Sequence, residues 1–88
     1  MTISAQVSIY PLRQERLTPA IETLTRAFAD HGLATEVGSM STIVLGEAEA
    51  IFAALRDGFV RAAELGHVVM TVTASNACPS IASPARSR

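Results

Sequence analysis

The order of its periodic segments is the feature that most restricts how this chain of 88 residues folds. Apolar side chains recur every second residue in some segments, as in strands, and every three to four residues in others, as in helices. The segments follow one another as strand, helix, strand, strand, helix, strand. A chain of this length has room for one domain with one core.

The first and last strands are the most clearly patterned segments. Residues 2–10 alternate strictly between apolar and polar side chains, and residues 67–75 alternate in the same sense. This pattern predicts two strands that are buried on one side only. The sides expected to face the helices carry Ile3, Ala5, Val7, Ile9, Val68, Met70, Val72 and Ala74.

Two helices are expected between these strands. The first should begin at Thr18 and Pro19, with the Thr18 side chain capping the free amides, and should end at Gly32. The second should span residues 47–65. Gly58 lies inside it, at a cost of up to about 1 kcal/mol relative to alanine, which indicates a point of close packing.

The middle of the chain predicts a hairpin. Residues 33–37 and 40–45 are expected to form two short strands around Gly38 and Ser39, which suit a two-residue turn. The alternative is a longer loop from Val37 to Thr42. The sequence leaves the register of this Leu33–Leu45 hairpin open, although a slip of one residue would exchange its two faces.

Together these segments predict an α+β fold of the ferredoxin-like βαββαβ type. Its four-stranded antiparallel sheet should have the order 4-1-3-2, with both helices on one face. We expect this domain to cover residues 1–79. Residues 80–88, rich in Ser, Ala, Pro and Arg, are expected to form a flexible tail.

Charge and composition exclude several classes of protein. All seven basic residues are Arg, and residues 1–85 carry five of them against eight acidic residues, a net charge of −3. Nucleic-acid binding, which needs clustered cations, is therefore not expected. No apolar run suits a membrane span, and no signal peptide is recognisable. Cys78 is the single cysteine, is expected to be an inert thiol, and fits a cytoplasmic location.

The sheet face turned away from the helices is expected to be uncharged on two neighbouring strands. The last strand also lacks charge and Pro between His67 and Asn76, and such edges pair readily with other chains. The hypothesis is a homodimer or homotetramer that uses this edge and the open face; the alternative is a hydroxyl-rich surface in contact with water. The face comprises Ser4, Gln6, Ser8, Tyr10, Val69, Thr71, Thr73 and Ser75.

Three short segments in matching order resemble the small thiamine-binding, YkoF-like family. They are residues 3–12, residues 37–42 with Gly46 and Glu47 after them, and residues 75–79. The resemblance implies a ferredoxin-like fold, assembly into dimers or tetramers through the sheets, and, in some members, binding of thiamine or its hydroxymethylpyrimidine portion in a pocket on the sheet side. Ser39, before Met40, departs from the family, in which Pro is common at this position.

The resemblance implies ligand contacts around five residues: Gln6, Ser8, Met40, Thr42 and Asn76. Side-chain chemistry adds three more candidates: Tyr10, Thr71 and Thr73. Amides match an aminopyrimidine edge, hydroxyls supply single hydrogen bonds, and Tyr or Met offers a surface for the ring. A thiazolium cation would favour a carboxylate, with Glu36 and Glu47 the nearest by chain position. The candidates are Gln6, Ser8, Tyr10, Met40, Thr42, Thr71, Thr73 and Asn76.

Each candidate also has a structural alternative. Gln6, Ser8 and Tyr10 suit an interface with a partner sheet, Met40 suits the core, and Asn76 suits a turn. No catalytic signature, metal-ligand spacing or phosphate loop is present, so neither an enzyme nor a resident cofactor or metal is expected. The sequence thus predicts non-catalytic binding of thiamine or hydroxymethylpyrimidine, with a self-assembling interaction domain as the alternative and an uncharacterised enzyme third.

Overall fold

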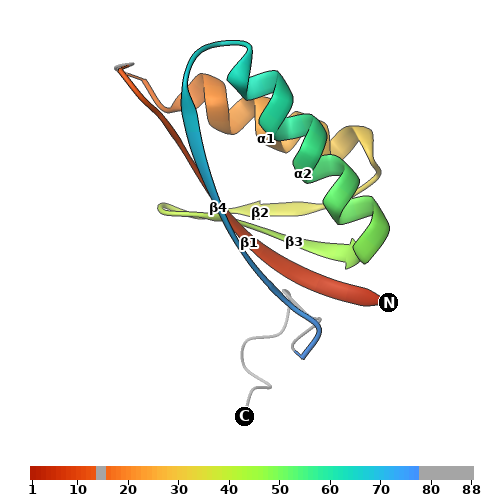
Figure 1. Cartoon of the computed structure of the whole chain (residues 1–88). Coiled ribbons are helices and arrows are strands. Elements are labelled where there is room, and N and C mark those ends of the chain that lie inside the picture. Colours follow the sequence, from red (N-terminus) through yellow and green to blue (C-terminus); the bar gives the residue numbers. More distant parts are fainter. Residues whose placement is uncertain (14–15, 78–88) are drawn as a thin grey trace.

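The computed structural model describes residues 1–13 and 16–77, and its six elements follow the expected order (Figure 1). Cys78 and the expected tail lie outside the described residues. The elements are β1 (Thr2–Pro11), α1 (Thr18–Asp30), β2 (Thr35–Val37), β3 (Thr42–Glu47), α2 (Ala48–Ala63) and β4 (Val68–Ser75).

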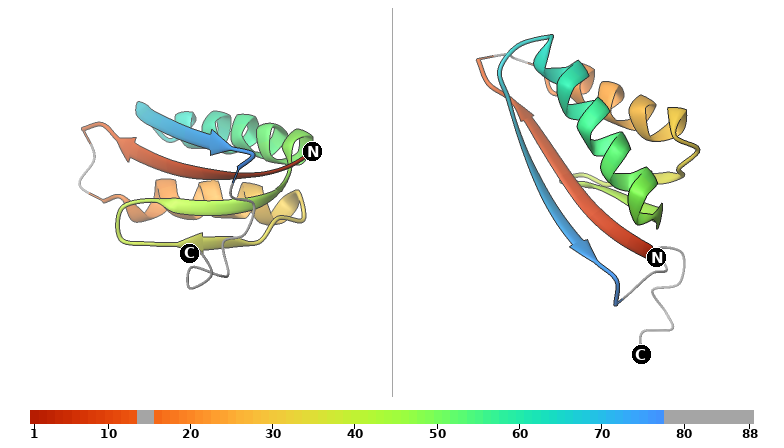
Figure 2. Two further views of the ribbon diagram at one scale, coloured as in Figure 1. Left: turned by 90° about the horizontal axis from the view of Figure 1, so that it is seen from below. Right: turned by 45° about the vertical axis from the view of Figure 1, so that its right-hand side comes forward.

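The four strands form one sheet in the order β2-β3-β1-β4, and each neighbouring pair is antiparallel. This is the predicted order 4-1-3-2, counted from the other edge. Both helices lie on the same side of the sheet, and no helix or strand that the structure describes covers the other side (Figure 2). The α+β prediction of a βαββαβ sandwich is therefore confirmed.

The core lies between the sheet and the two helices, as the alternation in β1 predicts. The four helix-facing side chains of β1 are buried, and the residues between them face the open side. Burial of this apolar surface is the main favourable contribution to folding. The largest fully buried side chains are Phe28, Leu24, Ile51, Val7 and Val44.

The start of α1 differs from the prediction. Leu17, and not Thr18, occupies the N-cap position, and no side chain caps the helix. The carbonyl of Leu17 accepts hydrogen bonds from the amides of Ala20 and Ile21, at 3.1 and 3.2 Å. The first turn therefore begins one residue earlier than expected, and the Thr18 side chain is inside that turn.

The hairpin between β2 and β3 has a loop of four residues, so the two-residue turn is wrong and the longer-loop alternative is correct. Val37 pairs with Thr42, and the Gly38 amide donates to the Ser41 carbonyl at 2.8 Å. This register places Val44, which is fully buried, opposite Thr35. A turn at Gly38 and Ser39 would instead have left Val44 beyond the end of β2.

Gly58 is the point of close packing that the sequence indicates. A Cβ atom there would lie 2.8 Å from the Leu24 Cδ1 atom and 3.4 Å from the Ala27 Cβ atom, both on α1. The absence of a side chain at Gly58 thus lets the two helices approach each other.

Polar contacts also join the two helices. His31 Nε2, just after α1, lies 2.7 Å from Asp57 Oδ2, and Arg61 donates to Asp30 at 2.8 Å. Arg56 Nε also donates to Asp57, at 3.2 Å. The hydrogen bond with His31, and to a lesser degree that with Arg56, holds the pKa of Asp57 below its ordinary value of 3.8.

We expect the Asp57→Asn variant to lose part of the acid sensitivity of the wild type. A carboxylate with a lowered pKa in the folded state stabilises the fold at neutral pH. That contribution is lost as the pH falls from the ordinary value of 3.8 through the lower folded pKa. Urea unfolding at a series of pH values measures the effect. Glu47→Gln should reduce the acid sensitivity in the same sense, because the pKa of Glu47 is also lowered, by the N-terminal ammonium group and Thr2. Identical pH profiles for Asp57→Asn and the wild type would contradict this role of Asp57.

Candidate functional site

A cavity of about 200 Å³ opens at one end of the sheet, between the end of β1, the start of α1 and the β2–β3 loop. The described residues of its wall are mainly apolar, with several hydroxyl groups and no charged side chain among them. The lining residues are Val7, Ser8, Ile9, Tyr10, Leu17, Ile21, Val37, Gly38, Ser39, Met40, Ser41 and Thr42.

The cavity extends to the helix-facing side of the sheet. Val7 and Ile9 point to that side and are buried, and Thr42 is the partner of Val7 in the antiparallel pairing of β3 with β1. Leu17 and Ile21 close the cavity from α1. The hollow is therefore beneath α1, and is not simply a depression in the open face.

Four of the eight predicted site residues line this cavity, namely Ser8, Tyr10, Met40 and Thr42. The Met40 side chain is 79% exposed at the loop, whereas Thr42 is only 4% exposed. The structure thus brings together candidates from β1, from the β2–β3 loop and from the start of β3 that are 30 residues or more apart in the chain.

Gln6, Thr71 and Thr73 do not line the cavity. The register pairs Gln6 with Thr73 and Ser8 with Thr71, so these side chains form two adjacent rows on the open face. Thr42 pairs with Val7 and therefore has the opposite orientation. The candidate hydroxyl groups are consequently divided between the two faces of the sheet.

Gln6 and Ser8 hold the β2–β3 loop. The Gln6 side-chain amide donates to the Ser41 hydroxyl at 3.0 Å, and the Ser8 hydroxyl donates to the Met40 carbonyl at 3.0 Å. These hydrogen bonds join the open side of β1 to the loop that walls the cavity. Both residues therefore have a positioning role in this structure.

Asn76 lies at the other end of the sheet. It borders a second, more open cavity of about 410 Å³ between the start of α2 and the end of β4. Ser75, beside it, pairs with Ser4, which precedes Tyr10 by six residues of β1. At about 3.3 Å per residue, that separation is about 20 Å, so Asn76 and Tyr10 cannot contact one small ligand.

The two predicted carboxylates are also outside the first cavity. Glu36 pairs with Ile43 in β2, and Glu47 accepts hydrogen bonds from Thr2 and the N-terminal ammonium group at the far end of β1. Within residues 1–13 and 16–77, the first cavity therefore offers no carboxylate to a cation.

Sequence reasoning missed the apolar part of the cavity wall. Val7, Ile9 and Ile21 follow the apolar periodicity of a core, and no local signal separates cavity-lining residues from core residues. Leu17 is the exception, because it is apolar and yet half exposed at the start of α1. Its position beside Thr18, the expected helix cap, was the one sequence signal that could have identified it as a cavity-lining residue.

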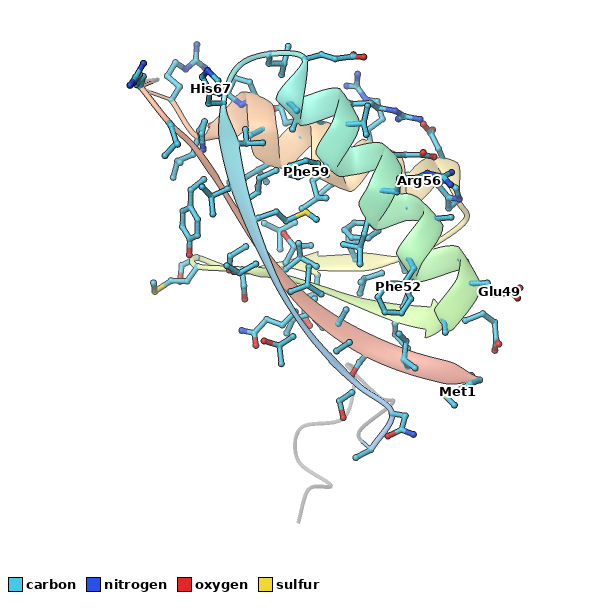
Figure 3. The ribbon with its side chains drawn as sticks, viewed as in Figure 1. Met1, Glu49, Phe52, Arg56, Phe59 and His67 are labelled. Carbon is cyan, nitrogen blue, oxygen red and sulfur yellow. The ribbon has the colours of Figure 1, made fainter. Side chains whose placement is uncertain are left out.

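The helix-facing side of β4 is less covered than expected. Val68 and Met70 pack against the core, but Val72 and Ala74 are exposed. Phe52 and Phe59 lie along α2, 53% and 38% exposed (Figure 3), and Phe52 and Ala74 both border the second cavity. We call Phe52, Phe59, Val72 and Ala74 the α2–β4 flank. The prediction that all four apolar residues of β4 are buried is wrong, because α2 covers only the first half of the strand.

The sequence model of the YkoF-related family matches residues 2–81 of the chain. The chain belongs to the YkoF-related family. No curated protein matches this YkoF-related chain. The resemblance of the three short segments is thereby confirmed at the level of the family.

Solved structures similar to this YkoF-related protein share its fold. A hypothetical protein from Methanocaldococcus jannascii has a TM-score of 0.80 at 20% identity, covering 91% of this chain and 88% of its own. A Thermotoga maritima protein, provisionally assigned to thiamine biosynthesis or salvage, has a TM-score of 0.80 at 19% identity, with 99% and 97% covered. A Streptococcus pneumoniae protein has a TM-score of 0.77 at 18% identity, with 85% and 86% covered.

Neither α1 nor α2 has the length and hydropathy needed to cross a bilayer. Within residues 1–13 and 16–77, no three His, Cys, Asp or Glu side chains converge as metal ligands would.

Proposed function

We propose that this YkoF-related domain binds a small ligand without changing it, and that the ligand is thiamine or its hydroxymethylpyrimidine portion. The observation that carries the proposal is the composition of the first cavity. Of the twelve described residues that line it, four come from residues 3–12 and six from residues 37–42, two of the three segments that resemble thiamine-binding relatives.

The chemistry of the wall suits such a ligand. Small-molecule sites are mostly apolar with a few placed polar groups, and here the polar groups are hydroxyls that both donate and accept hydrogen bonds. Ring nitrogens and an exocyclic amino group on an aminopyrimidine match them. The provisional assignment of the Thermotoga maritima protein to thiamine metabolism supports the same ligand class.

The wall also supports binding without reaction. Among the described residues, no Asp, Glu, His, Cys, Lys or Arg lines the cavity. These are the side chains on which general acid–base and nucleophilic catalysis mainly depend. Sequestration or delivery of the ligand therefore fits this site better than turnover.

Calorimetric titration with hydroxymethylpyrimidine and with thiamine tests the proposal. We expect saturable heat and a raised melting temperature, because a ligand bound only by the folded state stabilises it, by about 2.7 kcal/mol at a hundred times Kd. Leu17→Trp, which places an indole at the cavity, should weaken binding, whereas Val60→Trp on the exposed side of α2 should not. Neither heat nor a thermal shift at millimolar ligand would contradict the proposal.

The α2–β4 flank favours a second candidate, a domain that assembles with copies of itself. An uncharged edge strand with exposed backbone groups pairs readily with another strand, and the apolar flank continues that edge onto α2. The partner we propose is therefore another copy, bound along β4. The single cysteine means that the fold needs no internal disulfide, which fits the cytoplasmic location that we propose.

Val72→Glu tests this assembly. A carboxylate on the exposed edge should shift the protein towards monomer, because an unpaired charge is costly to bury between subunits. Sedimentation velocity at micromolar concentration measures the change. Val60→Glu is the matched control, since Val60 is also half exposed but faces away from β4. A wild-type protein that is monomeric throughout would contradict the second candidate.

A further inference from the structure

Thr42 is the one polar residue among those described whose side chain is buried, at 4% exposure. It begins β3 on the helix-facing side of the sheet, between its pairing partners Val7 in β1 and Val37 in β2. Both neighbours also line the first cavity. A hydroxyl is thus placed among apolar side chains, where an unpaired polar group is unfavourable.

The Thr42 hydroxyl has no hydrogen-bond partner among the described residues. In the same part of the chain, no side-chain polar atom is both sealed from solvent and unpaired. The hydroxyl therefore opens onto the cavity that Thr42 lines. A buried group of this kind is satisfied by whatever fills the cavity, either water or a polar atom of a ligand.

The volume of the cavity restricts the ligand. Cavities of about 150 Å³ accept benzene, and pockets for drug-sized molecules begin at about 300 Å³. A volume of about 200 Å³ therefore suits one six-membered ring with short substituents. A second ring would lie outside.

The charge of the wall restricts the ligand further. With no carboxylate among the described residues of the lining, a cationic ring that entered would lose its hydration without gaining a counter-charge from them. Glu36 and Glu47 belong to other parts of the surface. A neutral ring has no such penalty.

We propose that the Thr42 hydroxyl is the polar anchor that makes this cavity selective for a neutral, single-ring heterocycle with a hydrogen-bonding edge. The inference rests on the proposed function and refines it: the pyrimidine ring enters against Thr42, and the thiazolium ring of thiamine stays outside. Gln6 and Ser8 do not select the ligand but position the loop around it.

The Thr42→Val variant tests the anchor, because valine keeps the shape and removes the hydroxyl. We expect the affinity for hydroxymethylpyrimidine to fall about tenfold, the equivalent of one hydrogen bond, and Thr42→Ser to retain most of it. Thr73→Val, the same change on the open face, should leave affinity unchanged. Ligand-free Thr42→Val should melt no lower than the wild type, because no protein hydrogen bond is lost.

Toluene is an apolar ring of similar size that cannot use the Thr42 hydroxyl. Its binding therefore distinguishes loss of this one hydrogen bond in Thr42→Val from general damage to the cavity. Thermal shift and ligand-observed NMR should show that Thr42→Val binds toluene at least as well as the wild type. Thiamine should bind the wild type no more tightly than hydroxymethylpyrimidine does. A lower melting temperature of ligand-free Thr42→Val, equal weakening by Thr73→Val, or tighter binding of thiamine would each overturn the inference. Absence of all pyrimidine binding by the wild type would overturn the proposed function as well.

Discussion

Replacement of Phe28 with alanine is expected to lower the free energy of unfolding by about 3–5 kcal/mol. Phe28 is fully buried in α1 and is the largest of the fully buried side chains. The substitution removes its apolar contacts and leaves a cavity that close-packed neighbours fill only in part. Domains are stable by only about 5–15 kcal/mol in total, so the variant should be close to unfolding.

Urea unfolding followed by circular dichroism measures this effect, and Phe52→Ala is the matched control. Phe52 is 53% exposed on α2, so the same chemical change should lower the free energy of unfolding by less than about 1 kcal/mol. Similar losses for the two variants would show that Phe28 is not at the centre of the core.

The second large effect is expected at the contact between the helices. Gly58→Val should lower the free energy of unfolding by about 1–3 kcal/mol, since extra atoms in a filled space force neighbours out of their positions. The first added carbon would already lie 2.8 Å from Leu24 Cδ1. Leu24 is itself buried and has little room to move.

Ala53→Val separates this steric effect from helix propensity. Ala53 is in the middle of α2 and is only partly buried, on the side opposite Gly58's contact with α1. Valine is a poorer helix former than alanine by less than about 0.7 kcal/mol, and this is the whole loss expected there. A Gly58→Val variant as stable as Ala53→Val would contradict the close approach of the helices. Thermal unfolding of both proteins provides the comparison.

The fold was predictable because its signals are local and repeated. The strict alternation in β1, the apolar spacing around Leu24 and Phe28, and Gly32 after α1 each fix a segment independently. Once six segments are ordered, the handedness of the crossovers leaves few arrangements. The prediction that Thr18 caps α1 was wrong because the first helical hydrogen bonds are accepted by the backbone carbonyl of Leu17. Side-chain preferences do not reveal such a start.

The site was only partly predictable, because it depends on register and on the length of one loop. Thr42 and Thr73 have the same side chain in strands of the same sheet, yet the pairing with Val7 and Gln6 sends them to opposite faces. Asn76 follows β4 by one residue, but the antiparallel direction carries it to the far end of β1. The division of the eight candidates between three places could not be inferred from residue type.

The hydrogen bonds of Gln6 and Ser8 to the β2–β3 loop link the two surfaces of the thin sheet. Their side chains lie on the open face, while the loop that they restrain forms part of the cavity wall. A molecule that competed for these two donors from the open face would release the restraint on Met40 and Ser41. Its binding would then be coupled to occupancy of the cavity, with reciprocal effects on affinity.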